Sequence, residues 1–188
     1  MSALQKRLIP DEIDYTGEQL RSHWAYRSFD IAGDSIVAFI GRCDVQPRYM
    51  KDVEDLNRSA RIFSERMLHF IVEYFEADLD RGVLRQHLIM ACMAEVLNRR
   101  LNAGGIRREG SDLFDGDFKL TVSVASVSPV STLIHAGINC SSRNTPVPTR
   151  GLDDYGIDAR DFAHEVLQSY AREHKILYAA RCKVRGCE

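Results

Sequence analysis

Apolar and polar residues follow different periods along the chain, and each change of period marks a change of predicted structure. Apolar runs at Tyr26–Ile31 and Ser35–Ile40 flank the turn Gly33-Asp34, a pattern that predicts an N-terminal β-hairpin. From Asp52 to Tyr74, apolar residues recur at three- and four-residue intervals, which predicts an amphipathic helix. Its apolar face comprises Leu56, Ala60, Phe63, Met67, Phe70, Ile71 and Tyr74.

The second half of the chain carries two further helices and three strands. Apolar stripes predict a helix from about Asp80 to Leu101, and the glycines that follow it end that helix. Apolar and small polar residues alternate over residues 120–125, and Ser131–Cys140 forms the next apolar run, so we expect an antiparallel strand pair. An amphipathic helix at Ala159–His174 and a last strand at Ile176–Val184 complete the pattern.

The expected order is a β-hairpin, two helices, a second β-hairpin, a helix and a strand. Strict alternation of strand and helix, the mark of a doubly wound parallel sheet, is missing from this order. The pattern predicts the α+β class, with helices packed on a mostly antiparallel or mixed sheet. A length of 188 residues suits one domain, and we expect residues 1–188 to form a single domain.

Composition and charge narrow the expected partners and compartment. The formal net charge of −2 gives no support for a nucleic-acid partner. No run approaches the roughly 18 apolar residues of a membrane span, and the first residues lack a secretion signal, so we expect a cytoplasmic protein with no membrane partner. Five scattered cysteines indicate reduced thiols. There is neither a CxxC pair nor an HExxH motif, and we expect no metal site.

Lys119 is the first candidate for chemistry. It opens the predicted strand on the side of Thr121 and Ser123, directly after the charged turn at residues 115–117. Small side chains leave room above that face, and a lysine at the rim can place its charge on a phosphate or carboxylate. Ser123 is expected to hydrogen bond along the groove wall. The alternative is a solvated lysine paired with an aspartate of the turn.

Two arginines and an aspartate surround Gly110, just before this strand. Arg107 and Arg108 can bind an anion bidentately, and Asp112 can orient a lysine or a ribose hydroxyl. The alternative is a local ion pair, which is the common state of exposed charges.

The strand LIHAGINC places His135, Gly137 and Asn139 on one face. A histidine among apolar residues is either a hydrogen-bonded core residue or a group that faces a ligand. A glycine inside a strand often marks a place where a ligand or another backbone approaches closely. Gly137 is therefore the more informative residue of the three.

The stretch RREGSDLFDGDFKLTVSVAS resembles the loop and strand that face the acyl-adenylate in biotin and lipoate protein ligases. The residues at matching spacing are Arg108, Ser111-Asp112-Leu113, Gly116 and Lys119. HAGINC resembles the Gly-x-Asn strand end of biotin ligases. Along most of its length, the chain also resembles an uncharacterised archaeal and bacterial domain family grouped with this fold. The resemblance implies a biotin/lipoate ligase-like fold.

The same resemblance implies roles for individual residues. Lys119 would contact carboxyl or phosphate oxygens of a mixed anhydride, and Asp112 would help to place the lysine or a nucleotide. These two are the candidate catalytic residues. The candidate ligand-binding residues are Arg107, Arg108, Ser123, His135, Gly137 and Asn139. The implied ligand contains ATP or AMP, and the implied partner is an acyl-acceptor protein.

Two classes of function stay open at this stage. One is a ligase or acyltransferase that binds a small carboxylic acid or its acyl-adenylate. The other is a non-catalytic binding module in a regulatory or nucleic-acid-modification pathway, which the lack of a GRGRxGR-type loop favours. A homodimer paired through the strand at Ile176–Val184, if that strand lies at a sheet edge, and a monomer are equally consistent with the sequence.

Overall fold

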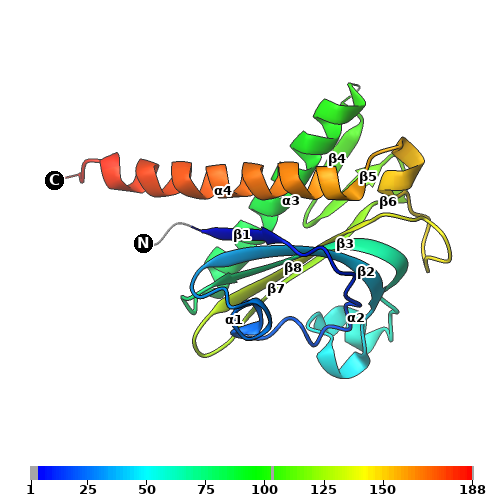
Figure 1. The fold of residues 1–188 in the computed structure, drawn as a ribbon, viewed down its shortest axis with the longest axis horizontal. Coiled ribbons are helices and arrows are strands. Elements are labelled where there is room, and N and C mark those ends of the chain that lie inside the picture. Colours follow the sequence, from blue (N-terminus) through cyan, green and yellow to red (C-terminus); the bar gives the residue numbers. More distant parts are fainter. Residues whose placement is uncertain (1–3, 103, 188) are drawn as a thin grey trace.

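The computed structural model describes residues 4–102 and 104–187, and it places two long helices beside two β-sheets (Figure 1). The strands are β1 (Gln5–Leu8), β2 (Ser35–Asp44), β3 (Phe63–Tyr74), β4 (Ile106–Glu109), β5 (Asp112–Asp115), β6 (Phe118–Lys119), β7 (Thr121–Val127) and β8 (Thr132–Asn139). The α-helices are α1 (Trp24–Phe29), α2 (Val53–Asn57), α3 (Leu79–Leu101) and α4 (Ala159–Lys183).

The larger sheet has five strands in the order β1-β2-β3-β8-β7, and the smaller has the order β4-β5-β6. In the larger sheet β1 runs parallel to β2, while the other neighbouring strands are antiparallel. The prediction of a mixed sheet with helices packed on it is therefore confirmed.

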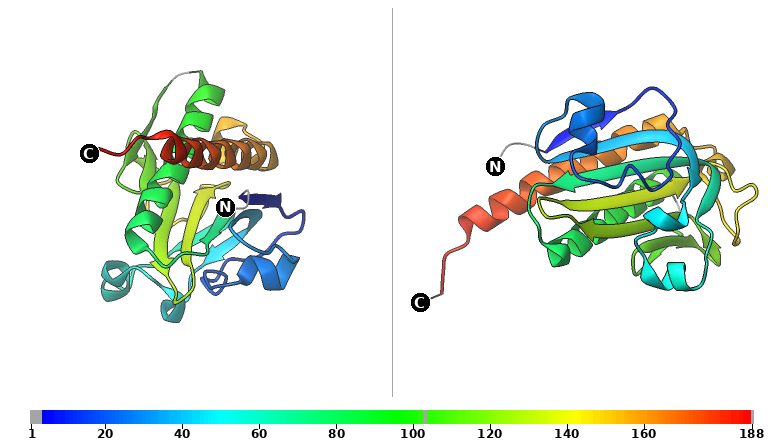
Figure 2. Two further views of the ribbon diagram at one scale, coloured as in Figure 1. Left: turned by 90° about the vertical axis from the view of Figure 1, so that its left-hand side faces the viewer. Right: turned by 90° about the horizontal axis from the view of Figure 1, so that it is seen from below.

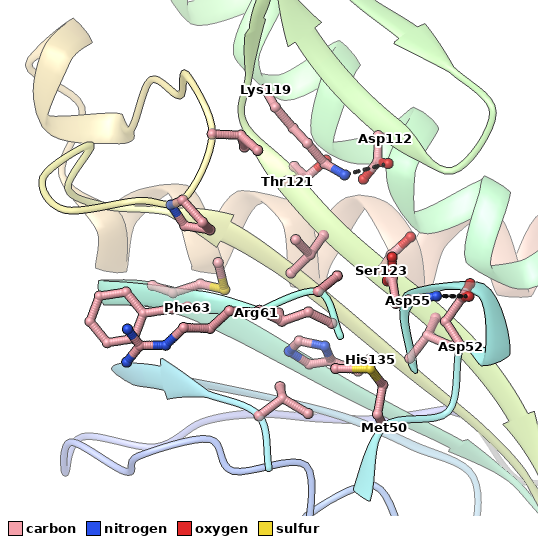
Figure 3. Close-up of a pocket in the computed structure, with 18 of the residues that line it drawn as sticks. Met50, Asp52, Asp55, Arg61, Phe63, Asp112, Lys119, Thr121, Ser123 and His135 are labelled. Carbon is pink, nitrogen blue, oxygen red and sulfur yellow. Dashed lines mark hydrogen bonds and ion pairs between the residues drawn. The ribbon is translucent and has the colours of Figure 1, made fainter. Parts of the chain in front are cut away.

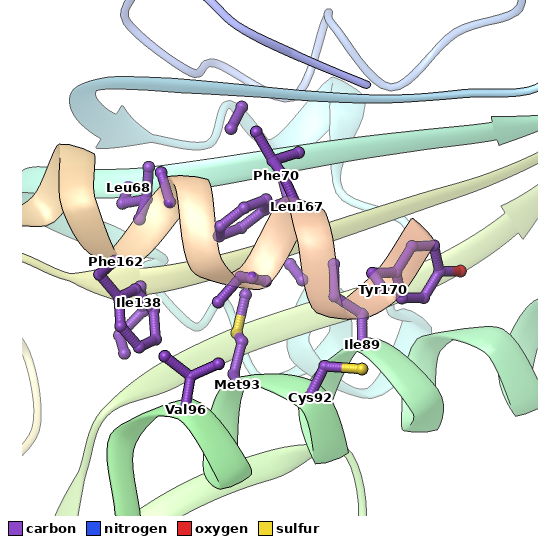
Figure 4. Packing of buried hydrophobic residues seen from close by; sticks show 14 of the residues in the cluster. Leu68, Phe70, Ile89, Cys92, Met93, Val96, Ile138, Phe162, Leu167 and Tyr170 are labelled. Atoms are coloured by element: carbon purple, nitrogen blue, oxygen red, sulfur yellow. The ribbon is translucent and has the colours of Figure 1, made fainter. Parts of the chain in front are cut away.

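Helices α3 and α4 cover one face of the larger sheet (Figure 2). Leu68 and Phe70 of β3 pack there with Met93 of α3 and with Phe162 and Leu167 of α4 (Figure 4). All five are at most 3% exposed. This layer is the main core, and it supports the sheet from the side opposite to the N-terminal segment.

The N-terminal segment and α1 cover part of the opposite face, over β2 and β3. Trp24 of α1 packs against Phe39 of β2, with 5.5 Å between ring centroids. The predicted hairpin with a strand at Tyr26–Ile31 is wrong, because most of that run belongs to α1. Its second half, Ser35–Ile40, is correctly a strand. A half-buried helix of six residues is too short to show a clear helical period.

Strand β3 corrects the predicted helix from Asp52 to Tyr74. Only Val53–Asn57 is helical, and Asp52 caps it by accepting hydrogen bonds from two backbone N–H groups. Strand β3 lies between β2 and β8 and is buried on both faces from Met67 to Tyr74. A strand covered on both faces is apolar over most of its buried length, so it also contains apolar residues at helical spacing.

Helix α4 continues to Lys183 and replaces the predicted strand at Ile176–Val184. Its last turns project beyond the sheets (Figure 1), where Ile176 and Leu177 are about half exposed. A helix satisfies its backbone hydrogen bonds internally, so this segment needs no neighbouring strand. The strand on which we based a homodimer is therefore absent from the described residues, and the homodimer itself stays a prediction.

Three other predictions agree with the structure. Helix α3 spans Leu79–Leu101, close to the predicted bounds, and β7 pairs antiparallel with β8. The connection that precedes β7 forms the small sheet. Among the described residues, no helix has the length and apolar character needed to cross a membrane.

Candidate functional site

A cavity of about 350 Å³ lies at the β7-β8 side of the larger sheet (Figure 3). Its floor includes Met67, Val122, Val124 and His135, which share the sheet face opposite α3 and α4. The segment 45–62, which connects β2 to β3, and residues 145–149 supply the surrounding walls. This volume suits a small organic ligand, because such sites usually enclose about 300 Å³ or more.

Lys119 and Asp112 form an ion pair in the wall of this cavity. Lys119 Nζ lies 2.8 Å from Asp112 Oδ2, and both side chains are mostly buried, at 31% and 24% exposure. The backbone around Lys119 is fixed by residues 148–150, since its N–H donates to Pro148 O over 3.0 Å. Fixed backbone on both sides gives the ammonium group a defined place at the cavity wall.

The Asp112 carboxylate is only partly satisfied. Its Oδ1 is buried and has no hydrogen-bond partner among the described residues. Burial raises the pKa of Asp112, and the hydrogen bond from Lys119 opposes that rise. A buried acceptor without a donor costs free energy, so this oxygen destabilises the folded wall.

A pair of buried histidines lies beneath the cavity. His69 Nδ1 is 3.1 Å from His135 Nε2, and His69 Nε2 is 3.4 Å from the Gly41 carbonyl oxygen. The Tyr15 ring stacks on His135 with 3.8 Å between centroids. Burial lowers the pKa of His69 to about 3 and holds the pKa of His135 well below its usual range. Both rings are therefore neutral at physiological pH.

The charges that line the cavity balance one another. The basic residues are Lys51, Arg61 and Lys119, and the acidic ones are Asp52, Asp55 and Asp112. Three of each sign leave no net charge on the described lining. This balance suits a ligand with one negative charge better than a polyphosphate, which needs a surplus of positive charge.

The buried cysteines Cys43 and Cys140 do not support thiol chemistry at this cavity. Cys43 and Cys140 are fully buried, and burial raises the pKa of each thiol to about 12. Neither lines the cavity. Among the described residues, no group of three or more His, Cys, Asp and Glu side chains could hold a metal ion, and the absence of a metal site stays a prediction.

Comparison with known proteins assigns the family. The family model described as "Domain of unknown function (DUF366)" matches residues 4–185. The chain belongs to this family. An uncharacterized protein of Methanocaldococcus jannaschii is 39% identical over 175 residues, which are 88% of the DUF366 chain and 77% of that protein.

Solved structures relate the DUF366 fold to two ligase families. A protein of unknown function from Pyrococcus horikoshi has a TM-score of 0.93 at 35% identity, covering 98% of this chain and 100% of that one. A mutant biotin protein ligase from Aquifex aeolicus in complex with biotin has a TM-score of 0.61 at 15% identity, with 93% and 71% covered. Lipoate-protein ligase A bound with ATP has a TM-score of 0.54 at 14% identity, with 90% and 85% covered. The predicted biotin/lipoate ligase-like fold is confirmed.

Most of the predicted site residues of the DUF366 chain meet at the cavity, although their roles stay predictions. The residues that line it are Asp112, Lys119, Ser123, His135 and Asn139. The expected alternative partners of Lys119 were aspartates of the 115–117 turn. Lys119 instead pairs with Asp112, while Asp115 accepts a hydrogen bond from Tyr155 Oη over 2.7 Å.

Gly137 is not part of the lining, although it lies on the same strand face as His135. A Cβ atom at this position would overlap the Met67 sulfur. The close approach that a strand glycine indicates is therefore made here by a side chain of β3.

Arg107 and Arg108 lie outside the cavity lining. The Arg107 guanidinium donates to Gly116 O over 2.7 Å and pairs with Glu109. Arg108 donates to Gly110 O within the β4-β5 turn. Both arginines are exposed on the small sheet, so the alternative of local pairing describes them better than the binding of a ligand anion.

The alternation along β7 was predicted correctly, but the floor of the cavity is formed by the face opposite to Ser123. Ser123 points to the helix side, where its hydroxyl accepts from Gln86 Nε2 and donates to Ser111 O. Val122 and Val124 instead lie on the face of His135. Ser123 reaches the cavity only because β7 is the edge strand. Periodicity separates two faces without showing which of them is covered.

The segment 45–62 is the part of the site that sequence reasoning missed. Its residues Tyr49 and Met50 line the cavity, as does Tyr15 from the N-terminal segment. We missed this segment because we predicted one long helix from Asp52 to Tyr74 in its place. A signal was present, because the polar run Asn57-Arg58-Ser59 interrupts the apolar period between the two real elements.

Proposed function

We propose that the protein binds a small carboxylic acid, free or as its acyl-adenylate, with Lys119 against the carboxyl or phosphate oxygens. The observation that carries this proposal is the mostly buried Lys119 ammonium in the wall of an apolar-floored cavity. Met67, Val122 and Val124 supply apolar surface for a hydrocarbon chain. The similar ligase structures, one in complex with biotin and one bound with ATP, support a small ligand for this fold.

In this proposal the reaction is acyl transfer of the ligase type. An acceptor nucleophile attacks the acyl carbon, the bond from that carbon to the phosphate oxygen breaks, and AMP leaves. Lys119 stabilises the negative charge that develops on the oxygens, and preorganised charge of this kind is a large catalytic term. Asp112, with its pKa raised by burial, takes the proton of the acceptor. The acceptor is a protein, and the compartment is the cytoplasm.

Isothermal titration calorimetry with octanoate, lipoate, biotin, ATP and AMP tests the proposal. We expect at least one carboxylate to bind, and Lys119→Ala to weaken that binding at least about tenfold, since a hydrogen bond to a charged group contributes roughly 1.5–3 kcal/mol. Lys175→Ala is the matched control, because Lys175 is exposed on α4, away from the cavity. No binding by any compound, or equal binding in Lys119→Ala, would overturn the proposal.

A non-catalytic binding module is the second candidate, and one observation favours it. Acidic and basic residues are equal in number in the described cavity lining, so the lining has no excess of positive charge to bind the phosphates of ATP. Mass spectrometry of small molecules that copurify with the protein separates the two candidates. An acyl-adenylate supports the enzyme, whereas a free nucleobase or no nucleotide at all supports the module.

A further inference from the structure

The histidine pair beneath the cavity has only one consistent arrangement of protons. His69 Nε2 lies 3.4 Å from the Gly41 carbonyl oxygen, and a carbonyl oxygen can only accept. His69 must therefore carry its proton on Nε2. Because burial keeps this ring neutral, its other nitrogen, Nδ1, has a free lone pair.

The proton on His69 also determines the tautomer of His135. His69 Nδ1 can only accept, so the 3.1 Å contact requires a proton on His135 Nε2. His135 is also buried and neutral, so its Nδ1 is the bare nitrogen. His69 thus acts as a positioning residue, which fixes the tautomer of His135 through a backbone carbonyl.

The bare nitrogen of His135 has no partner in the protein. No hydrogen bond joins His135 Nδ1 to any residue within 4–102 or 104–187. His135 lines the cavity (Figure 3). The stacked Tyr15 ring holds the plane of the imidazole. The unpartnered nitrogen of His135 is therefore the acceptor that the apolar floor can offer to a ligand, separate from the cation at Lys119.

We infer that the ligand is a carboxylic acid whose distant end carries a polarised N–H, as in an amide, lactam or cyclic urea, and that His135 Nδ1 accepts this hydrogen bond. This inference rests on the proposed function, since it adds a second contact to the ligand that Lys119 holds. Alkyl and dithiolane acids fill the apolar cavity but leave the His135 lone pair unsatisfied. A site built around a buried acceptor discriminates against ligands that lack the donor.

The first test concerns the tautomer and needs no ligand. Nitrogen chemical shifts of the ¹⁵N-histidine-labelled protein at neutral pH distinguish a protonated ring nitrogen from a bare one. We expect Nε2 to be protonated and Nδ1 bare in both His69 and His135. A proton on His135 Nδ1 would overturn the inference and leave the proposed function standing.

The second test is selectivity, measured by calorimetry with biotin, which has a cyclic urea, and with octanoate, which has no N–H donor. We expect biotin to bind about tenfold more tightly, and His135→Phe to abolish this preference while octanoate still binds. His135→Gln should restore part of it, because the amide can donate to His69 and keep an accepting oxygen. His164→Phe, on the exposed side of α4, is the control.

The outcomes separate the inference from the proposed function. Lys119-dependent binding of both acids without any preference, or a preference that survives in His135→Phe, contradicts the role of His135 alone. Absence of binding by either acid contradicts the proposed function, and the inference falls with it. Thermal unfolding of each variant identifies a loss of binding that arises from a loss of fold.

Discussion

Gly137 of β8 leaves room for the Met67 side chain of the neighbouring strand β3 on the same face of the sheet. The Met67 sulfur of the neighbouring strand β3 occupies the space that a Cβ atom would need. We expect Gly137→Ala to lower the free energy of unfolding by about 1–3 kcal/mol, as overpacked sites do. Gly105→Ala is the control, since no atom lies within 4 Å of its added Cβ. Urea unfolding that shows equal losses in both variants would contradict this role.

The neutral histidine pair predicts how stability depends on pH. The pKa of His69 is about 3 in the folded protein and that of His135 is also depressed, whereas both are near 6.5 in an unfolded chain. Below about pH 6.5 the unfolded state therefore binds protons that the folded state does not. The free energy of unfolding should fall on acidification by roughly 1 kcal/mol per pH unit for each ring.

Urea unfolding at about pH 7.5 and about pH 5.5, on either side of the ordinary histidine pKa, measures this dependence. Replacing both His69 and His135 with Phe should reduce the slope, and burial of His174, which also lowers its pKa, accounts for part of what remains. An identical slope in the double variant would assign the acid sensitivity to other groups.

At the scale of residues, the sequence predicted the place of the site better than its contacts. Lys119, His135 and Asn139 lie at the cavity, as a strand-borne lysine and a shared strand face had suggested. The ion pair between Lys119 and Asp112 agrees with the expectation that Asp112 places the lysine, whereas the turn residue Asp115 accepts a hydrogen bond from Tyr155. Hydrogen-bond partners depend on how distant segments pack against each other, which the periodicity of the sequence does not reveal.

Helix α4 has a buried half and an exposed half, and the same residue type occurs in both. Leu167 is 3% exposed and packs in the main core, whereas Leu177 is 54% exposed. We expect Leu167→Ala to cost about 2–5 kcal/mol of stability and Leu177→Ala less than about 0.5 kcal/mol. Denaturant unfolding of the two variants measures both values. A large cost at Leu177 would mean that another surface covers the end of the helix in solution.

At the scale of elements, prediction succeeded mainly where one side of an element is more buried than the other. Helix α3 and the edge strand β7 have one side that is less buried than the other, so their periods are visible, whereas β8 is buried throughout and was found from its apolar run. Strand β3 is buried on both faces, and the end of α4 is exposed on most sides, so neither has a readable period. The single-domain organisation stays a prediction.

The walls of the cavity come from distant parts of the chain, which gives a prediction for the whole molecule. Tyr15, the segment 45–62 and residues 145–149 meet only in the folded protein. Saturating ligand should therefore slow amide hydrogen exchange in all three segments together and leave α4 unchanged. Exchange measured by mass spectrometry with and without a bound carboxylate tests this. Protection confined to α4 would place the ligand elsewhere.

The two wall segments lie outside the hydrogen-bonded ladder of the larger sheet. Segment 45–62 links β2 to β3, and the chain around residues 145–149 leads away from the end of β8. Insertions or exchanges there would not shift the register of the five strands or the packing of α3 and α4. Substrate preference can therefore diverge through changes in segment 45–62 while Lys119 and the histidine pair keep their positions, whereas changes at residues 148–150 would also move the backbone of Lys119.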